Sequence, residues 1–248
     1  MRIVLLQSAF FYLVMTIEYL PLHRKNMTTV NYTLPLIDFN EIDTLIWDWN
    51  GTLLDDVEVN IKVVNKMLSR RGLHQLDLTT YKELFCFPVQ SFHKRIGFDF
   101  EKESIEDISA EYHATYKIYE DEIRLNPDAI FILNLLLKKG MNQYILSAAM
   151  RSDLENMLNH FNIADKFNEI YGVDDICATG KIEIGKRLMS DNFLNPSRTL
   201  IIGDTLHDAE VADSLGVKCI LFSEGHNSYD LMIKKGKVIG SLKDIVYF

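Results

Sequence analysis

The amino-acid sequence predicts an α/β protein with a doubly wound parallel sheet and a helical cap inserted after the first strand. Short apolar runs, typical of buried parallel strands, alternate with amphipathic stretches, which is the pattern of strands joined by crossover helices. Several of these runs end directly at a polar residue. A long aromatic-rich stretch, residues 57–124, follows the first run and shows helical rather than strand periodicity.

The predicted strands end at a turn signal or at a single polar residue. The first ends at Asp48, the second at Ser147, and the fourth at Gly203–Asp204. In chain order the runs are Thr44–Trp47, Tyr144–Leu146, Glu169–Tyr171, Thr199–Ile202 and Lys218–Phe222. Ligands of parallel sheets bind at the carboxyl ends of the strands, so these polar residues are expected to share one site beneath the cap.

The predicted helices are bounded by start and stop signals that sequence alone supplies. Apolar residues from Val57 to Leu68 recur at three- and four-residue spacing, which places them on one helix face. The expected helices are residues 57–68 ended by Gly72, 127–139 opened by Asn126–Pro127 and ended by Gly140, 152–160 opened by a capping box of Ser152 and Glu155, 181–189, and 207–215 ended by Gly216.

Composition excludes several classes of protein. The chain has 248 residues, of which 48% are hydrophobic, so it is neither wholly disordered nor fibrous. Lys and Arg number 26 and Asp and Glu 35, giving a net charge of −9 that disfavours nucleic acid and anionic membranes as partners. The cysteines Cys86, Cys177 and Cys219 form no CxxC pair, which argues against disulfides and thiolate zinc. A cytoplasmic protein, monomeric or homodimeric, is expected.

Residues 1–40 are interpreted as an N-terminal extension of uncertain role. The apolar run Ile3–Met15 is shorter than the roughly 20 residues that a membrane-spanning helix requires. Only Arg2 precedes the run, and no small-residue cleavage site follows it, which makes a poor signal peptide. The alternatives are a dispensable extension with the functional start at Met27, a signal or anchor, and a packed structural segment.

Two stretches near predicted strand ends carry residues suited to phosphoryl chemistry. In the sequence Asp48-Trp49-Asn50-Gly51-Thr52-Leu53, a strand-end carboxylate beside Gly-Thr suits a phosphate-accepting nucleophile, although Asn-Gly also marks a simple turn. A hydroxyl at Ser147, next to free backbone N–H groups, suits a phosphate oxygen, although a strand-end serine without function is common.

Two further stretches supply a cation and more carboxylates. Residues 180–186 nearly match a phosphate-binding P-loop, but Arg187 replaces the required Ser or Thr, so Lys181 is interpreted as a single phosphate-neutralising cation. The alternative is an ordinary surface lysine. In residues 203–208, Asp204 and Asp208 behind a glycine turn suit a hard cation such as Mg²⁺, and capping of the next helix is the competing role.

In this order the motifs resemble those of the haloacid dehalogenase superfamily, and the helical cap after the first strand resembles its phosphoglycolate phosphatase-like branch. The resemblance runs from about residue 43 to the C-terminus. It implies a Rossmann-like core of residues 41–56 and 125–248 and a helical cap of residues 57–124. It also implies a magnesium-dependent phosphatase acting on a small phosphorylated metabolite through an aspartyl-phosphate.

The same resemblance assigns roles to residues of this chain. The implied catalytic residues are Asp48 as nucleophile, Asn50 and Lys181. The implied phosphate-binding residues are Asp48, Gly51, Thr52, Ser147, Ala148 and Lys181. The implied magnesium ligands are Asp48, the backbone carbonyl of Asn50, Asp204 and Asp208.

Asn50 departs from the phosphatase pattern, which has an aspartate acid–base at that position. An amide cannot exchange a proton in this role, and general acid–base catalysis is worth about 10²–10⁴ in rate. The residues that could carry the proton in its place are Asp55, Asp56 and His207. The other readings are a phosphonatase-like carbon–phosphorus hydrolase and a non-catalytic phosphate-binding protein. The first of these needs a Schiff-base lysine in the cap, for which the sequence offers Lys62, Lys66, Lys82 and Lys94.

Overall fold

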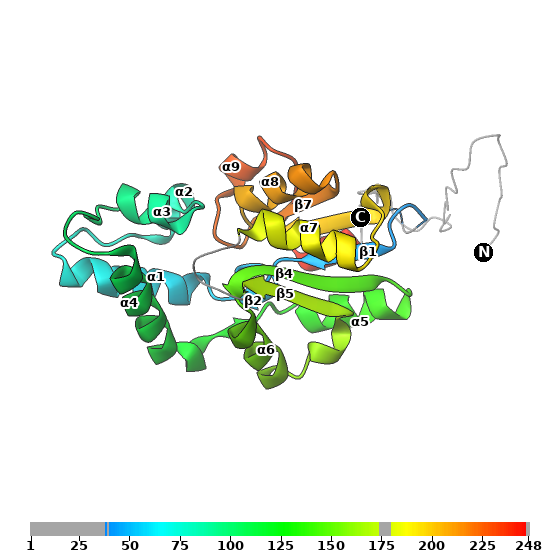
Figure 1. The fold of residues 1–248 in the computed structure, drawn as a ribbon, viewed down its shortest axis with the longest axis horizontal. Helices are drawn as coiled ribbons and strands as arrows, with labels where there is room; N and C mark the ends of the chain where they lie inside the picture. Colours follow the sequence, from blue (N-terminus) through cyan, green and yellow to red (C-terminus); the bar gives the residue numbers. More distant parts are fainter. Residues whose placement is uncertain (1–37, 39, 174–179, 247–248) are drawn as a thin grey trace, which may run out of the picture. The chain divides into compact units, whose positions relative to one another are not determined.

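A computed structural model describes residue 38 and residues 40–173 and 180–246. Its centre is a six-stranded, all-parallel sheet, which confirms the predicted fold class (Figure 1). The strand order is β5 (Glu169–Val173), β4 (Asn142–Met150), β1 (Thr44–Trp47), β6 (Thr199–Gly203), β7 (Lys218–Phe222) and β8 (Lys237–Ile239). The order reverses on either side of β1, so β1 lies at the switch point where ligands of such sheets bind.

Helices cover both faces of the sheet because alternate side chains of each strand point to opposite faces. Leu45 and Trp47 of β1 pack with the helices below the sheet in Figure 1, whereas Ile46 packs with those above it. The lower helices are α5 (Ala129–Lys138), α6 (Arg151–His160) and η4 (Leu242–Ile245), and the upper ones include α7 (Lys181–Asp191) and α8 (Leu206–Leu215). The remaining core elements are α9 (Tyr229–Met232), η2 (Ala164–Lys166) and η3 (Pro196–Arg198).

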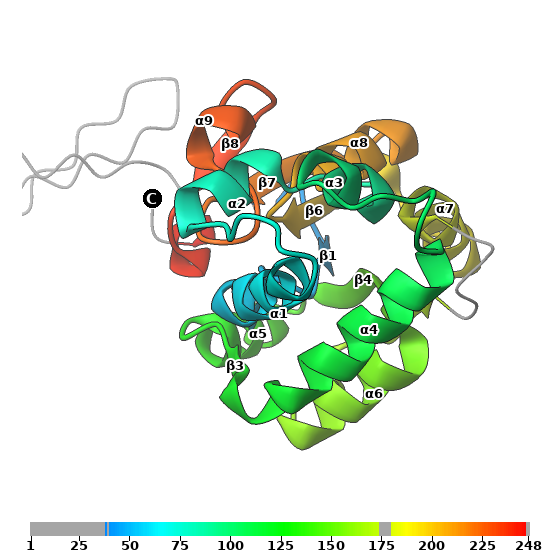
Figure 2. The same cartoon turned by 90° about the vertical axis from the view of Figure 1, so that its left-hand side faces the viewer.

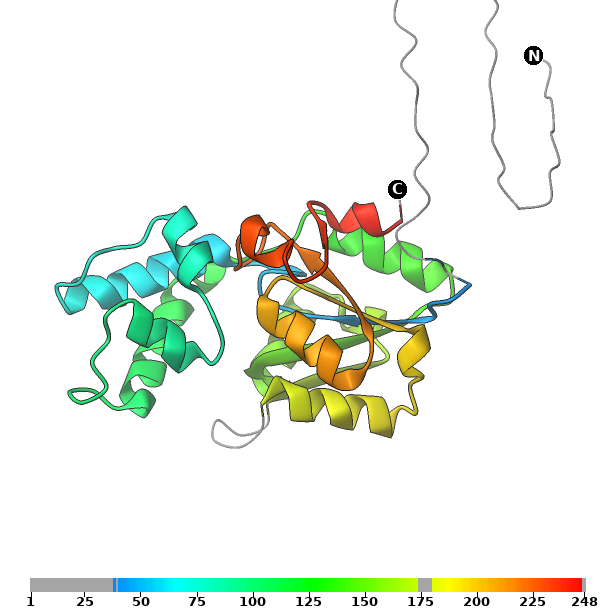
Figure 3. The ribbon, with the colours of Figure 1, turned by 90° about the horizontal axis from the view of Figure 1, so that it is seen from above.

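The cap is helical, as predicted, and follows β1 in the chain. Its elements are α1 (Val57–Arg70), α2 (Leu78–Leu84), α3 (Val89–Arg95), α4 (Ile105–Ile118) and η1 (Glu120–Glu122) (Figures 2 and 3). A two-stranded antiparallel ribbon, β2 (Leu54–Asp55) with β3 (Arg124–Leu125), joins the two crossings between core and cap. The cap is therefore a single insertion entered and left at one place.

The cap contacts the core through the segment that follows β7. Lys82 of α2 donates to the carbonyl oxygen of Ser223 (2.8 Å), and Asn227 Nδ2 donates to the carbonyl oxygen of Phe85 (2.8 Å). The hydroxyl of Tyr81 lies 2.9 Å from His226 Nδ1. These bonds join backbone and side chains of both parts, so the structure shows the cap in contact with the core.

Several local predictions need correction. Helix α5 begins at Ala129 rather than at Pro127, and Asp128 is its N-cap residue. The capping box predicted from Ser152 is wrong: β4 continues to Met150, the helix begins at Arg151, and among the described residues no side-chain cap forms at its start. Ser147 therefore lies inside β4, at a register shift between Leu146 and Met150, rather than at its end. Strands β2, β3 and β8 were not predicted because runs this short show no periodicity.

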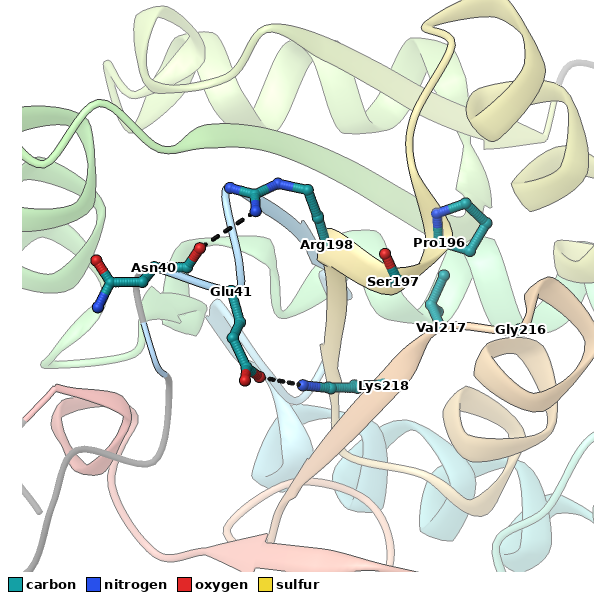
Figure 4. A pocket seen from close by; sticks show the side chains of 8 residues that line it. All are labelled: Asn40, Glu41, Pro196, Ser197, Arg198, Gly216, Val217 and Lys218. Carbon is teal, nitrogen blue, oxygen red and sulfur yellow. Dashed lines mark hydrogen bonds and ion pairs between the residues drawn. The ribbon is translucent and has the colours of Figure 1, made fainter. Parts of the chain in front are cut away.

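The amino-terminal edge of the sheet carries a hollow of about 660 Å³ (Figure 4). Arg198 precedes β6 and Lys218 begins β7, so the hollow lies at the opposite ends of these strands from Asp204. Its lining charges are already engaged, since Arg198 pairs with Asp43 (2.5 Å) and Lys218 with Glu41 (3.0 Å). The lining residues are Asn40, Glu41, Pro196, Ser197, Arg198, Gly216, Val217 and Lys218. Paired charges give the hollow little attraction for an anionic ligand.

The predictions about residues 1–37 and Cys177 fall outside the described residues. Within the described parts of the chain, no helix combines the length and the apolar composition needed to cross a membrane.

Candidate active site

The candidate site forms where the central strands end. In the sheet Trp47 of β1 is in register with Ile145 of β4 and Ile202 of β6, so the residues that follow each of them are neighbours. The backbone N–H of Asp48 donates to the carbonyl oxygen of Ile202 (2.8 Å), which fixes the start of the turn after β1. Parallel pairing alone therefore brings Asp48 beside the residues that follow β6.

Three carboxylates meet at this edge of the sheet. Asp48, Asp204 and Asp208 each offer an oxygen, and these oxygens lie within 4.8 Å of one another. All three side chains are buried, and Asp204 has no exposed surface. Asp48 follows β1, Asp204 follows β6, and Asp208 lies in the first turn of α8. The sequence predicted this grouping.

One lysine lies among these carboxylates. The ammonium of Lys181, the first residue of α7, pairs with Asp48 Oδ1 and with Asp208 Oδ1, the latter at 2.5 Å. The other oxygen of Asp208 accepts hydrogen bonds from the backbone N–H (2.9 Å) and the hydroxyl (2.7 Å) of Thr205. Lys181 is thus a buried cation of the cluster rather than a surface lysine.

Thr52 joins Asp48 to Asp204, the carboxylate with which Lys181 forms no ion pair in the described structure. Its hydroxyl lies 3.1 Å from Asp204 Oδ1 and 3.4 Å from Asp48 Oδ2, and the side chain is fully buried. The backbone N–H of His226 donates to the other oxygen of Asp204 (2.5 Å). The acidic cluster is therefore framed by donors from the turn after β1 and from the segment after β7.

Burial and like charge oppose the ionisation of this cluster. Burial raises the pKa of Asp48 well above its ordinary value, with Asp208 and Asp204 adding to the rise against the pull of Lys181. Burial and Asp208 also raise the pKa of Asp204. Burial would raise the pKa of Asp208 too, but attraction to Lys181 and the bonds from Thr205 outweigh it and lower that pKa.

The donor set fits a hard divalent cation. Carboxylate oxygens are the ligands that Mg²⁺ prefers, and three of them converge here with one ammonium to balance them. Two of the three carboxyls have raised pKa values, which means that the protein alone leaves their negative charge poorly compensated. A cation held by Asp48, Asp204 and Asp208 would supply that compensation.

The remaining predicted site residues are placed as follows. Ser147 is buried and its Oγ accepts from the N–H of Ala149 (3.0 Å), while Ala148 is exposed. Gly51 has a φ of +75°, and a Cβ there would overlap Asp204 Oδ2, so only glycine fits. The N–H of Gly51 donates to Asp56 Oδ1 (2.8 Å) and Asn50 Nδ2 donates to Asp56 Oδ2 (2.8 Å), so both already have a protein partner.

His226 is the residue at this edge that sequence reasoning missed. It is buried, its Nε2 lies 3.4 Å from Asp56 Oδ1, and attraction to Asp56, outweighing its burial, raises the pKa of His226 to about 8. The signal that could have found it is the one used for the other strands, namely polar residues following the apolar run of β7.

Of the proposed substitutes for the missing acid, Asp55 is exposed in β2, and His207 stacks on Phe87 with its Nδ1 3.1 Å from Glu210. Neither contacts the acidic cluster through a hydrogen bond that the structure shows. Asp56 is buried, and although burial alone would raise its pKa, bonds from His226 and others lower it. An ionised Asp56 is a poor proton donor.

Comparison with known proteins identifies the family. The family model described as haloacid dehalogenase-like hydrolase matches residues 45–222, which is more than half of the chain. The chain belongs to this family. The match covers the turn after β1, the cap, Lys181 and the segment around Asp204, which are the stretches on which the sequence resemblance was based.

Relatives and solved structures agree with this assignment. A 5'-nucleotidase of Pseudomonas aeruginosa is 28% identical over 191 residues, covering 75% of this chain and 85% of that protein. A phosphoglycolate phosphatase of Pseudomonas fluorescens is 25% identical, covering 74% and 70%. The family and its phosphatase relatives confirm the prediction of a phosphoric monoester hydrolase.

Two solved structures show the same fold. A haloacid dehalogenase-like family protein of Streptococcus pneumoniae superimposes with a TM-score of 0.62 at 22% identity, covering 82% of this chain and 96% of that one. CbbY of Rhodobacter sphaeroides, solved in complex with phosphate, gives a TM-score of 0.63 at 17% identity, covering 81% and 94%. At these identities the likeness concerns the fold.

Proposed function

We propose that the chain is a magnesium-dependent phosphatase that cleaves small phosphorylated metabolites through an aspartyl-phosphate on Asp48. The observation that supports this most directly is the buried group of three carboxylates around Lys181 at the carboxyl edge of the sheet. Such a group is costly without a ligand, because like charges in a buried site destabilise one another.

In the proposed reaction a carboxylate oxygen of Asp48 attacks phosphorus and the bond from phosphorus to the alcohol oxygen of the substrate breaks. Water then hydrolyses the acyl phosphate and releases inorganic phosphate. Bound Mg²⁺ would neutralise phosphate charge and shield Asp48 from it. Lys181 and Ser147 would hold phosphate oxygens, and Asp208 orients Lys181 through its ion pair.

Asn50 has no proton to give, so substrates with good leaving groups are the most suitable for this site. The test is magnesium-dependent phosphate release from acetyl phosphate and p-nitrophenyl phosphate by the wild type and by Asp48→Asn. Turnover that disappears in Asp48→Asn supports the proposal, whereas equal rates in both would refute it. A substrate panel should then include phosphoglycolate and nucleoside 5'-monophosphates, the substrate classes named for the relatives.

A carbon–phosphorus hydrolase is the second candidate, and Lys82 is the observation that favours it. Lys82 is half-buried and reaches from α2 to the core, and burial lowers its pKa, as a Schiff-base lysine requires. By contrast, the exposed Lys62 pairs with Glu122. Borohydride trapping with a carbonyl-bearing phosphonate distinguishes the candidates, since only a Schiff base on Lys82 gives an adduct that Lys82→Arg abolishes.

A further inference from the structure

A buried carboxylate beside the proposed nucleophile has no part in the function proposed above. Asp56 is 1% exposed and precedes α1. Its Oδ2 accepts from Asn50 Nδ2 (2.8 Å), from Asn60 Nδ2 (2.8 Å) and from the hydroxyl of Tyr116 (3.0 Å), while its Oδ1 accepts from the N–H of Gly51 (2.8 Å). Four donors satisfy a buried carboxylate almost completely.

These donors belong to separate parts of the molecule. Asn50 and Gly51 lie in the turn directly after the nucleophile, Asn60 lies in α1, and Tyr116 lies in α4 of the cap. His226 of the core, whose Nε2 is 3.4 Å from Asp56 Oδ1, adds a fifth neighbour and carries a hydrogen bond with Tyr81 of the cap. The Asp56 carboxylate thus connects the nucleophile turn with helices α1 and α4 of the cap and with the segment after β7.

Asp56 does not use its carboxylate for the usual task of its position. It is the N-cap residue of α1, where an aspartate normally accepts from the N–H groups of the first helical turn. No such side-chain bond is formed at this helix. The carboxylate instead points back to Asn50 and Gly51, so its orientation serves the turn rather than the helix.

This geometry explains the residue at position 50. An aspartate there would place its carboxylate where the amide nitrogen now lies, 2.8 Å from Asp56 Oδ2, and a partly buried carboxylate at this distance from a buried one is repelled strongly. Asparagine supplies an N–H donor instead. We infer that Asn50 and Asp56 form a matched pair in which Asp56 is a positioning residue that holds the Asn50–Gly51 turn beside Asp48 and couples that turn to the cap.

The kinetic side of this inference rests on the proposed phosphatase function, but its structural side does not. Four proteins test both: the wild type, Asn50→Asp, Asp56→Asn, and the double variant that exchanges the two residues. Asn50→Asp is expected to lower the Tm by about 5 °C or more, since two carboxylates then face each other. Asp56→Asn is expected to lower kcat on p-nitrophenyl phosphate by about 10–100-fold, the usual effect of losing a group that orients ligands.

The exchanged pair again places one carboxylate opposite one amide. Its Tm is expected to return to within about 2 °C of the wild type, with kcat at least about tenfold above that of Asn50→Asp. If the decreases in Tm of the two single variants simply add in the double variant, residues 50 and 56 do not form a matched pair. An unchanged kcat in Asp56→Asn would overturn the positioning role.

The matched control is Glu111→Gln. Glu111 also ties α4 to the end of α1, through Arg70 and Arg71, but it has no contact with the nucleophile turn. It should lower the Tm slightly and leave kcat unchanged, which separates cap stability from positioning. If the wild type shows no magnesium-dependent turnover, the proposed function fails, while the Tm comparison of the four proteins still decides whether residues 50 and 56 are paired.

Discussion

Two clusters of charged residues, one in the cap and one in the core, differ in their charge balance and in their exposure to water. In the cap, Arg71 pairs with Glu103 (2.5 Å) and Glu111 (2.6 Å), and Arg70 pairs with Glu111 (2.6 Å). Two cations therefore meet two carboxylates. The side chains remain partly exposed, from 13% for Arg71 to 51% for Arg70, so water completes their solvation.

In the core, Lys181 is the ammonium shared by Asp48 and Asp208, with Asp204 adjoining them. Within the described parts of the chain, Lys181 is the cation that forms ion pairs with these carboxylates, and the charge of the nearby His226 also favours ionised Asp204. The side chains of the two ion pairs are at most 10% exposed. The cap cluster is balanced and needs nothing more. The core cluster carries excess negative charge in a buried place, an arrangement that a bound cation would stabilise.

Removing the proposed nucleophile should have the largest effect on function. Asp48→Asn is expected to lower phosphate release by about 10⁴-fold or more, because the acyl phosphate can no longer form. Without metal the Tm should not fall, since the substitution removes one of three crowded carboxylates whose charge burial disfavours. Phosphate assays and thermal denaturation measure the two effects. Turnover at the wild-type rate would exclude Asp48 as nucleophile.

Removing Lys181, the cation shared by Asp48 and Asp208, should cause the largest loss of stability. Lys181→Met leaves Asp48 and Asp208 buried without their partner, a change that typically costs about 3–5 kcal/mol. Lys186→Met is the matched control, because Lys186 lies in the same helix but is exposed and pairs with Glu183 at the surface. Chemical denaturation of both variants gives the difference. Equal losses of stability in the two variants would show that the core cluster carries no excess negative charge.

Magnesium should stabilise the wild type by neutralising the excess negative charge of the core cluster. At a concentration about 100 times its Kd, the ion adds about 2.7 kcal/mol to the free energy of unfolding. Asp204→Asn removes a proposed ligand and should lose most of the resulting rise in Tm. The comparison is a thermal melt with Mg²⁺ against one with EDTA. A rise of the same size in Asp204→Asn would place the ion elsewhere.

The core and the acidic cluster were predictable because both follow from local pattern and one topological rule. Each central strand is an apolar run followed by a polar residue, and parallel pairing brings those residues together, so the sequence was enough to predict that Asp48 and Asp204 lie side by side. The third carboxylate, Asp208, followed from its spacing to Asp204. Lys181 needed more, since its burial depends on where α7 packs, and the sequence pointed to it only through a partial P-loop match and the order of the motifs.

What escaped prediction depends on contacts between distant segments. The role of Asp56 depends on Asn50, Tyr116 and His226, which lie in three different parts of the chain. A local pattern at Asp56 gives only a helix N-cap, and that is the task its side chain does not perform. The failed capping box at Ser152 has a similar cause, since pairing of β4 with β5 extends β4 to Met150 and moves the helix start.

A buried histidine beside the cap cluster makes the stability of the protein depend on pH. Burial lowers the pKa of His93 in the cap to about 4, and the neighbouring Arg71 adds to this. A folded-state pKa below the unfolded value of about 6.5 means that the stability it contributes is complete above pH 6.5 and is lost as pH falls toward 4. Replacing His93 with Gln should therefore flatten the decline in Tm between pH 6.5 and 4. An unchanged decline would mean that His93 is not buried as a neutral group.

The smallest effect is expected at the balanced cluster. Glu111→Gln removes one carboxylate from two arginines that water and Glu103 still solvate, so the loss should be about 1 kcal/mol, or about 2–4 °C in Tm. High salt should shrink this difference, because screening weakens partly exposed ion pairs, whereas it should leave most of the Lys181→Met loss in place. Melting both variants at low and high salt measures the contrast. If the loss of stability in Glu111→Gln were insensitive to salt, the cap cluster would be as shielded from water as the acidic cluster in the core. Exposure to water would then no longer distinguish the balanced cluster in the cap from the core cluster with its excess negative charge.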